Sequence, residues 1–202
     1  MKRHVMDTTT PMIYEIVFHY NSDWVEFYWD VEGEYPSQIT EPIGEPVSTS
    51  NFVDSNHDSN VATRRSHKGI LFFVFNGLIR AFRKRHNNDK SSTFGSDLVA
   101  LRITRDLIVE LRIKLDSVGV TLRGPTYVYC DNQWVVMNTS IPESTLNNKH
   151  NSINYHIVRK TAAYRIIRAV KEDTATNLAD PLTKLMPYSQ RNELLGQILY
   201  YY

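Results

Sequence analysis

The order of strand and helix patterns along the chain predicts a mixed α/β fold in which three antiparallel strands are followed by parallel ones, with helices on the flanks. Three strand patterns come first, within residues 46–85. A long amphipathic helix pattern follows, and strands then alternate with helices. Closely spaced strands pair antiparallel, whereas a helix between two strands returns the chain parallel, so this order predicts one mixed sheet.

The three leading strands are expected on either side of turn-forming sequence. The first is PVSTSNFVD at 46–54, and the second is the strongly apolar HKGILFFVF at 67–75. Asn76-Gly77 comes next, a dipeptide that favours a tight type I′ hairpin turn. We therefore expect residues 78–85 to return as the third strand.

The long helix is expected to begin at the capping residues 91–93 and to end at Gly119. Residues at helical spacing form one stripe along it: Asp97, Leu101, Thr104, Ile108, Leu111 and Leu115. Such a stripe predicts a face that packs against the sheet.

Alternating elements follow the long helix. We expect a strand at 126–131 (TYVYCD), a helix at 149–163 and a strand at 164–170. Thr174 is a candidate cap for a short helix, and a last helix is expected at 189–200. We divide the chain into a partly extended leader at 1–46, a main domain at 47–186 and a C-terminal helix at 187–202.

Composition restricts the class of protein. With 42% hydrophobic and 22% charged residues, the 202-residue chain can bury a core. The single Cys130 excludes an internal disulfide and a zinc site built from several thiolates, and it favours a reducing compartment. We expect an intracellular, cytoplasmic location. No apolar run approaches the ~18–20 residues of a membrane span, so we expect no membrane partner.

Charge is unevenly distributed, although the net charge is only +1. Residues 1–60 hold 2 Lys/Arg against 11 Asp/Glu, whereas residues 61–90 hold 8 Lys/Arg and one acid, Asp89. This basic block is typical of a surface that faces phosphates. A solvated strand edge protected by Lys and Arg is an equally good interpretation.

Four acids occupy positions where a site would form. Asp54 and Asp131 end strands, Asp97 lies on the apolar stripe in the expected first turn of the long helix, and Asp180 lies beside the last short helix. Carboxylates gathered at strand ends can bind Mg²⁺, which prefers oxygen ligands. Each acid also has a structural interpretation: a turn residue, a helix-dipole acid, a helix cap and a second turn residue, in chain order.

Five sequence blocks, in this order and at this spacing, resemble the RNase H domain at the end of copia-type LTR retrotransposon polyproteins. The resemblance extends from about Asp23 to about Tyr200. The blocks are TRRSHKG (63–69), SSTFGSDLVALR (91–102), CDN (130–132), IPESTLNNKHNSINYH (141–156) and TNLADPLTK (176–184).

The resemblance implies a fold, an activity and partners. The fold is RNase H-like, a five-stranded mixed sheet flanked by helices. The activity is cleavage of the RNA strand of RNA–DNA hybrids during reverse transcription, with two Mg²⁺ ions, or Mn²⁺ as an alternative, held by Asp54, Asp97, Asp131 and Asp180. Residues 1–46 then correspond to the connector from a preceding reverse transcriptase region of the same polyprotein, which is an expected partner besides the hybrid.

Roles are also expected for several residues outside the four acids. The candidates for contact with nucleic acid are Thr63, Arg64, Arg65, Lys68 and Asn132, although a surface role without nucleic acid fits the basic ones nearly as well. His150 and His156 are expected to pack or to hydrogen-bond rather than to bind metal, and Tyr127 and Tyr129 are expected in the core.

Two departures from the family pattern lie at the expected site. The second acid is usually Glu, and Asp97 is one methylene shorter; Pro181 follows the fourth acid and disfavours helical backbone at Asp180. We therefore expect a chain that folds but cuts hybrid weakly or not at all as it stands, and the alternative is a non-enzymatic remnant that folds and can bind nucleic acid. A DNA-cutting integrase of the same fold superfamily is disfavoured because the sequence has no His/Cys zinc module.

Overall fold

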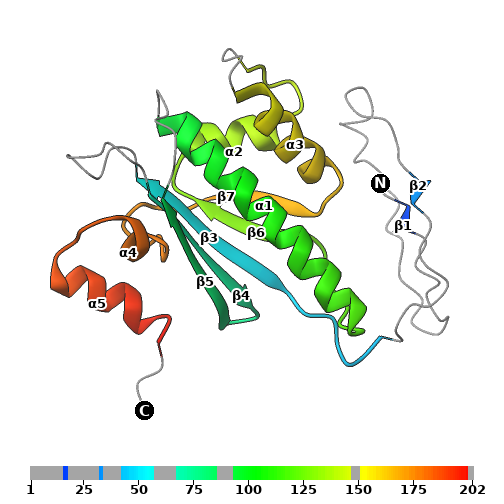
Figure 1. The fold of residues 1–202 in the computed structure, drawn as a ribbon, viewed down its shortest axis with the longest axis horizontal. Coiled ribbons are helices and arrows are strands. Elements are labelled where there is room, and N and C mark those ends of the chain that lie inside the picture. Colours follow the sequence, from blue (N-terminus) through cyan, green and yellow to red (C-terminus); the bar gives the residue numbers. More distant parts are fainter. Residues whose placement is uncertain are drawn as a thin grey trace.

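The computed structural model describes residues 16–17, 32–33, 42–56, 67–85, 93–146 and 151–199. Its centre is a five-stranded sheet in the order β5-β4-β3-β6-β7 (Figure 1). The strands are β3 (Thr49–Asn56), β4 (His67–Val74), β5 (Gly77–Arg85), β6 (Thr126–Cys130) and β7 (Ile167–Lys171). A separate two-stranded ladder pairs β1 (Ile16–Val17) with β2 (Glu32–Gly33).

The strand directions confirm the expected topology. β3 pairs antiparallel with β4, and β4 pairs antiparallel with β5. β6 pairs parallel with β3 on the other side, and β7 pairs parallel with β6. The helices are α1 (Thr93–Ser117), α2 (Gln133–Ser140), α3 (Ser152–Ala163), α4 (Asp180–Thr183) and α5 (Tyr188–Gly196).

Helices cover both faces of the sheet, so β4 is buried on both sides (Figure 1). Ile70 and Phe72 join the larger core, under α1, α2 and α3, whereas Leu71 and Phe73 join a smaller core with residues of the α4–α5 region. This explains why the second strand pattern is continuously apolar rather than alternating. The buried members of the smaller core are Leu71, Phe73, Leu178, Leu194 and Ile198.

The hairpin turn lies one residue earlier than expected. Val74 pairs with Gly77, so Phe75 and Asn76 form the turn, and of these two only Phe75 has a positive φ, 52°. A type I′ turn needs positive φ at both central residues, so the expectation of that turn at Asn76-Gly77 was wrong. The β4–β5 register, which shifts between Phe72 and Phe73, places Gly77 in the strand instead.

The long helix follows the predicted stripe. Asp97, Leu101, Thr104 and Ile108 are buried, and Gly119 follows the helix with a φ of 80°. Asp97 is the fifth residue of α1, beyond the first turn in which it was expected. No helix among the described residues is long and apolar enough to cross a membrane.

The expected cap at Thr174 was wrong. The short helix α4 begins at Asp180 instead. Thr174 lies in a turn, and its hydroxyl donates a hydrogen bond to Asp131 Oδ2 at 3.3 Å.

Candidate functional site

Strand alternation divides the acidic residues near the end of β3 between the two faces of the sheet. Successive side chains of a strand point to opposite faces. Asp54 accepts a hydrogen bond from the Thr183 hydroxyl of α4 on one face, and the Ser55 hydroxyl donates to the Asp97 carboxylate of α1 on the other. Asp54 is 3% exposed, so its carboxylate is buried where β3 ends, at one end of the sheet, rather than lying in a turn.

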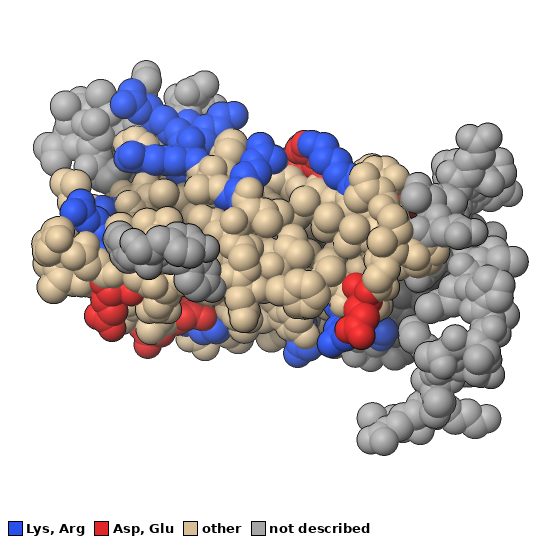
Figure 2. Space-filling view, turned by 90° about the horizontal axis from the view of Figure 1, so that it is seen from below, with Lys and Arg blue, Asp and Glu red and all other residues tan. Residues whose placement is uncertain are grey.

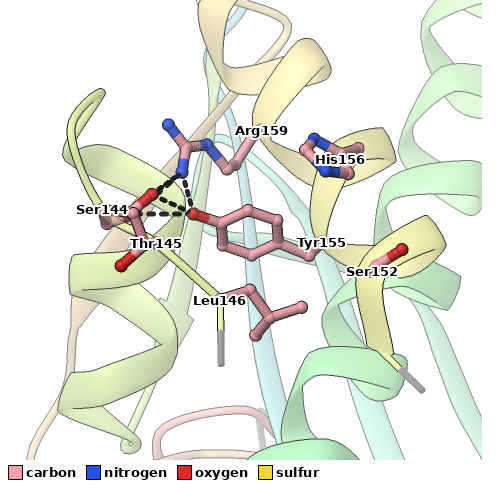
Figure 3. Close-up of a pocket in the computed structure, with 7 residues that line it drawn as sticks. All are labelled: Ser144, Thr145, Leu146, Ser152, Tyr155, His156 and Arg159. Carbon is pink, nitrogen blue, oxygen red and sulfur yellow. Dashed lines mark hydrogen bonds between the residues drawn. The ribbon is translucent and has the colours of Figure 1, made fainter. Parts of the chain in front are cut away.

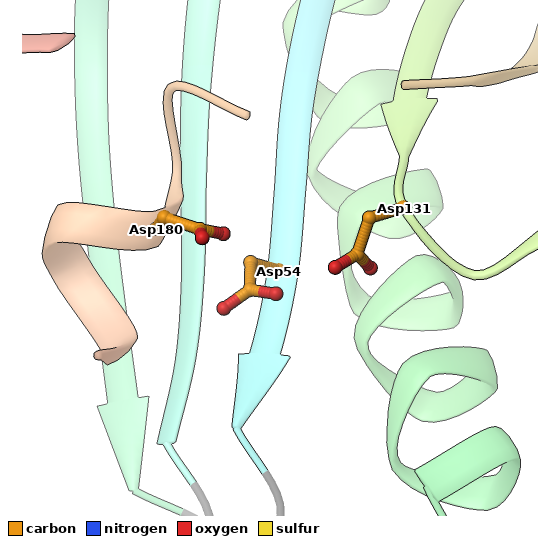
Figure 4. Close-up of side chains that lie close together, drawn as sticks. All are labelled: Asp54, Asp131 and Asp180. Carbon is orange, nitrogen blue, oxygen red and sulfur yellow. The ribbon is translucent and has the colours of Figure 1, made fainter. Parts of the chain in front are cut away.

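Three carboxylates meet at this edge. Oxygens of Asp54, Asp131 and Asp180 all lie within 4.8 Å of one another. Asp54 lies in β3 and Asp131 follows the neighbouring parallel strand β6, so both reach the same end of the sheet, and α4 brings Asp180 beside them (Figure 4). The predicted convergence is therefore present for three of the four acids.

Direct packing of α4 on the sheet positions Asp180. Gly69, which pairs with Asp54 across β3 and β4, lies beneath α4. A Cβ on Gly69 would lie 2.7 Å from the Leu182 Cβ and 3.0 Å from the Ala179 carbonyl oxygen, closer than side chains approach. The sheet therefore accepts this helix only because residue 69 lacks a side chain.

A buried asparagine fastens the segment that enters α4. Asn177 is completely buried, and its Nδ2 donates to the Val53 carbonyl at 3.1 Å. Its Oδ1 accepts from the Ala179 backbone N–H, also at 3.1 Å. Because Val53 immediately precedes Asp54, Asn177 couples the position of α4 to the strand that carries the first acid.

Pro181 does not disturb Asp180 as the sequence suggested. Asp180 is the first residue of α4 and Pro181 the second, and the Asp180 carbonyl accepts the Lys184 backbone N–H at 2.9 Å. Backbone N–H groups in a first helical turn have no partner within the helix, so proline is well tolerated there. The expectation that Pro181 disfavours helical backbone at Asp180 was wrong, because Asp180 is the first residue of α4.

Lys184 lies among the three carboxylates, and sequence reasoning missed it. Its Nζ is 2.9 Å from Asp180 Oδ1, 3.1 Å from Asp54 Oδ1 and 3.6 Å from Asp131 Oδ2. The available signal was the spacing, because Asp180 and Lys184 are four residues apart on a short helical segment.

Asp97 does not join the three-carboxylate group among the described residues. Its Oδ1 accepts from the Ser55 hydroxyl, and its Oδ2 accepts from Asn132 Nδ2 at 2.8 Å. Both carboxylate oxygens therefore have hydrogen-bond donors within the protein. The short side chain remains on the α1 side of the sheet end.

Burial perturbs the acids of the site electrostatically. Burial, more than mutual repulsion, raises the pKa of Asp97 to about 6 and that of Asp180 to about 6, and burial also raises the pKa of Asp54. Burial alone would lower the pKa of Lys184, but the attraction of Asp54 and Asp180 outweighs it and raises that pKa. The ammonium therefore remains charged beside the acids.

The structure places the predicted nucleic-acid-binding residues in different environments. Thr63, Arg64 and Arg65 lie outside the described residues. Lys68 is 1% exposed on the α1 side of β4, so the expectation that it grips a backbone phosphate is not supported. Asn132 caps α2, where its Oδ1 accepts from the Trp134 and Val135 backbone N–H groups at 3.1 and 3.3 Å.

An exposed basic edge lies at the same end of the sheet. Arg83, Lys84 and Arg85 are exposed at the end of β5, and Arg83 pairs with Gly69, the partner of Asp54. Two strand spacings, roughly 10 Å, therefore separate this edge strand from β3. Figure 2 shows Lys and Arg side chains gathered along one margin of the molecule.

The histidine and tyrosine expectations are met only in part. His156 is exposed, with its ring 5.2 Å from that of Tyr155, and His150 lies outside the described residues. Tyr129 is half-buried and stacks on Phe52, but Tyr127 is 36% exposed beside Arg168, so its expected core position was wrong.

A pocket of about 300 Å³ between the α2–α3 connection and α3 lies apart from the carboxylates (Figure 3). Arg159 crosses one side of it, where its guanidinium donates to the Pro142 and Ser144 carbonyls and contacts the Tyr155 hydroxyl. These bonds hold the connection against α3. The Arg159 side of this pocket therefore has a structural role, because its polar groups bind other residues of the same chain.

Comparisons with known proteins agree with this geometry. No protein-family model matches the sequence. The chain is 27% identical over 149 residues to the retrovirus-related Pol polyprotein from transposon TNT 1-94 of Nicotiana tabacum, covering 72% of this chain and 11% of that protein. It is 34% identical over 70 residues to the corresponding polyprotein from transposon RE1 of Arabidopsis thaliana, covering 35% of this chain and 5% of that protein.

Solved structures share the fold at low sequence identity. The RNase H domain of a Mycobacterium tuberculosis protein has a TM-score of 0.53 at 14% identity, covering 74% of this chain and 97% of that one. An RNase H1 isolated from compost has a TM-score of 0.53 at 13% identity, covering 67% and 92%. The chain thus spans a small part of the retrovirus-related Pol polyproteins that it resembles in sequence, and its fold is that of an RNase H domain.

Proposed function

We propose that this chain is an RNase H-type endonuclease domain that cleaves the RNA strand of RNA–DNA hybrids. The observation that carries the proposal is the meeting of Asp54, Asp131 and Asp180 within 4.8 Å at one edge of the sheet. The same compost RNase H1 has also been solved in complex with an RNA/DNA hybrid, and that structure shares the fold with a TM-score of 0.52 at 11% identity.

The residues present fit a divalent cation. Carboxylate oxygens are the ligands that Mg²⁺ and Mn²⁺ prefer, and the buried Asp54 and Asp180 already attract a cation, the Lys184 ammonium. Asp54, Asp131 and Asp180 would hold the metal, and Asp97, on the α1 side of the same sheet end, would be a fourth ligand. Bound ions of this kind activate water and stabilise the oxygen that departs from the RNA phosphate.

The hybrid would be held by the basic edge. Arg83, Lys84 and Arg85 lie at the same sheet end as the carboxylates, so backbone phosphates bound there would pass close to the acids. Thr63, Arg64 and Arg65 remain candidates for the same surface, as does Asn132 beside Asp97. The reverse transcriptase portion of a longer polyprotein, in an intracellular, cytoplasmic setting, remains the proposed context.

A non-enzymatic remnant is the second candidate function. Its support is that Asp97 is bonded to Ser55 and Asn132 rather than joined to the other three acids. The core is meanwhile intact, and cores tolerate change better than metal geometry does. Such a protein would fold and bind hybrid without cutting it.

A mutant series separates the two candidates by the initial cleavage rate of a labelled hybrid in Mg²⁺. Asp97→Glu, whose side chain is one methylene longer, should raise the rate by up to about 10²-fold, since a ligand misplaced by about 1 Å costs that much. Asp131→Asn added to it should abolish cleavage. Pro181→Leu, which leaves the acids in place, should not change the rate.

Each outcome decides between the candidates. Cleavage that persists in Asp97→Glu/Asp131→Asn would show that the carboxylate cluster is not the catalytic centre. If the wild type and Asp97→Glu both fold and bind hybrid but neither cuts, the chain is a remnant. If the wild type already cuts as fast as Asp97→Glu, the shorter acid is not a defect.

A further inference from the structure

Lys184 occupies the place among the carboxylates where a divalent cation would bind. Its Nζ contacts Asp180 at 2.9 Å, Asp54 at 3.1 Å and Asp131 at 3.6 Å. One oxygen from each of these acids lies within 4.8 Å of the others, so an ammonium in contact with all three carboxylates lies in the space that a shared metal ion would need. A metal ion held by the same oxygens and this ammonium cannot share that space.

The charges at the cluster do not balance. Two of the carboxylate side chains, those of Asp54 and Asp180, are only 2% and 4% exposed and cannot turn into water. Crowded buried carboxylates repel one another unless a positive charge lies between them. Among the described residues one ammonium offsets one of three negative charges, so the cluster retains an attraction for a cation of higher charge.

The lysine itself can leave the cluster more easily than the acids can. Lys184 follows the last residue of α4 in extended conformation, with φ −113° and ψ 145°, and its side chain is 28% exposed. A flexible four-carbon stem lets the ammonium move toward solvent. A protonated amine also has no lone pair to offer a metal, so it competes with a metal ion rather than assisting it.

We propose that Lys184 is an internal cation that holds the three carboxylates together in the metal-free protein and must leave them before a divalent ion binds. This inference rests on the proposed metal-binding role of Asp54, Asp131 and Asp180. The divalent-ion affinity of the site is then set by a competition within the chain, and occupancy of the site by Lys184 is a resting state that the ion must displace.

The test compares Mn²⁺ binding by Lys184→Met and by the wild type, measured by isothermal titration calorimetry with MnCl₂. Methionine keeps an unbranched stem but removes the charge, so the dissociation constant should fall by at least about tenfold, because the ion no longer has to displace an ammonium from the carboxylates. Lys114→Met is the matched control. Lys114 also pairs with an acid four residues away, Glu110, but on the exposed surface of α1, so its loss should leave Mn²⁺ affinity unchanged.

Two further measurements keep the test decisive if Lys184→Met is unstable without metal. Mn²⁺ should raise the Tm of Lys184→Met by more than it raises that of the wild type, because the ion replaces the missing charge. Lys184→Arg keeps the charge and should bind Mn²⁺ no more tightly than the wild type.

Mn²⁺ binding and hybrid cleavage are measured in separate assays, so that failure of this inference can be distinguished from failure of the proposed function. Tighter Mn²⁺ binding by Lys184→Met, with no hybrid cleavage by the wild type or by Asp97→Glu, would support the internal cation while refuting the nuclease. A Lys184→Met protein that binds Mn²⁺ no better than the wild type, and gains no more in Tm, would overturn the inference even if the wild type cuts hybrid.

Discussion

Adding one methyl group at Gly69 should displace α4 and weaken the carboxylate cluster. In Gly69→Ala the new Cβ would lie 2.7 Å from the Leu182 Cβ and 3.0 Å from the Thr183 Cγ2. Ordinary carbon contacts begin at about 3.5 Å, so α4 must retreat by roughly 0.8 Å. Overpacking of this kind costs about 1–3 kcal/mol of unfolding free energy.

The retreat would act directly on the chemistry, because α4 carries Asp180 and delivers Lys184. A displacement of about 1 Å at a catalytic group costs on the order of 10²-fold in rate. We therefore expect Gly69→Ala to lower the Tm, the Mn²⁺ affinity and the Mg²⁺-dependent cleavage of hybrid together. Calorimetry, thermal unfolding and a hybrid cleavage assay measure the three quantities.

Gly196→Ala in α5 is the matched control, because a Cβ there meets nothing within 4 Å. It should stabilise the helix by about 0.5–1 kcal/mol and leave ion affinity unchanged. If Gly69→Ala kept wild-type Tm and wild-type Mn²⁺ affinity, close packing of α4 on β4 would not be what positions the site.

Two further predictions concern protons and phosphates. Burial raises the pKa of Asp97 from 3.8 to about 6, so the folded protein holds a proton that the unfolded chain has released. The free energy of unfolding of the metal-free protein should therefore fall as pH rises from about 4 to about 6, and Asp97→Asn should reduce that fall in denaturant titrations; an equal fall in both proteins would contradict it. Charge reversal of Arg83 and Arg85 should weaken hybrid binding and reduce the salt dependence of that binding, as measured by fluorescence anisotropy titration. The control is charge reversal of the exposed Arg123, which precedes β6 at the opposite end of the sheet and should leave both the affinity and its salt dependence unchanged. An unchanged salt slope would place the hybrid elsewhere.

The periodicity of apolar residues was sufficient to predict the sheet, because the spacing of these residues along the chain shows which faces of a strand or helix are buried. The continuous apolar run of β4 reflects a strand covered on both faces, and the stripe from Asp97 to Ile108 reflects the packed face of α1. Asp54 and Asp131 could be placed together because parallel neighbouring strands end at one edge. These are backbone consequences, which follow from periods of 2.0 and 3.6 residues.

The details of the site could not be predicted in the same way, because they depend on side-chain reach. The spacing placed Asp97 near the other acids. The hydrogen bonds that its carboxylate accepts from Ser55 and Asn132 depend on side-chain length, which differs by one methylene between Asp and Glu. Helical backbone at Asp180 was not expected before Pro181, but α4 begins at Asp180, so the proline lies in the first turn, where it is tolerated. Lys184 was missed because a charge four residues from an acid is ordinary on a helix surface, and only the packing on Gly69 turns it into a buried contact.

The division of the site between distant parts of the chain has a consequence for biosynthesis. The Thr183–Asp54 hydrogen bond joins residues 129 positions apart, and α4 meets the sheet only after β3, β4 and β6 have been made. A chain grows at about 5–20 residues per second, so Asp54 waits roughly 6–26 seconds for its partners to be made. The larger core is complete only once Ile167 has been made, 13 positions before Asp180, so for roughly 1–3 seconds it can form around α1 while the carboxylates still lack Asp180 and Lys184. A ribosome-bound chain would thus pass through a folded stage with an incomplete site, unable to engage a hybrid through these acids until the last helices dock.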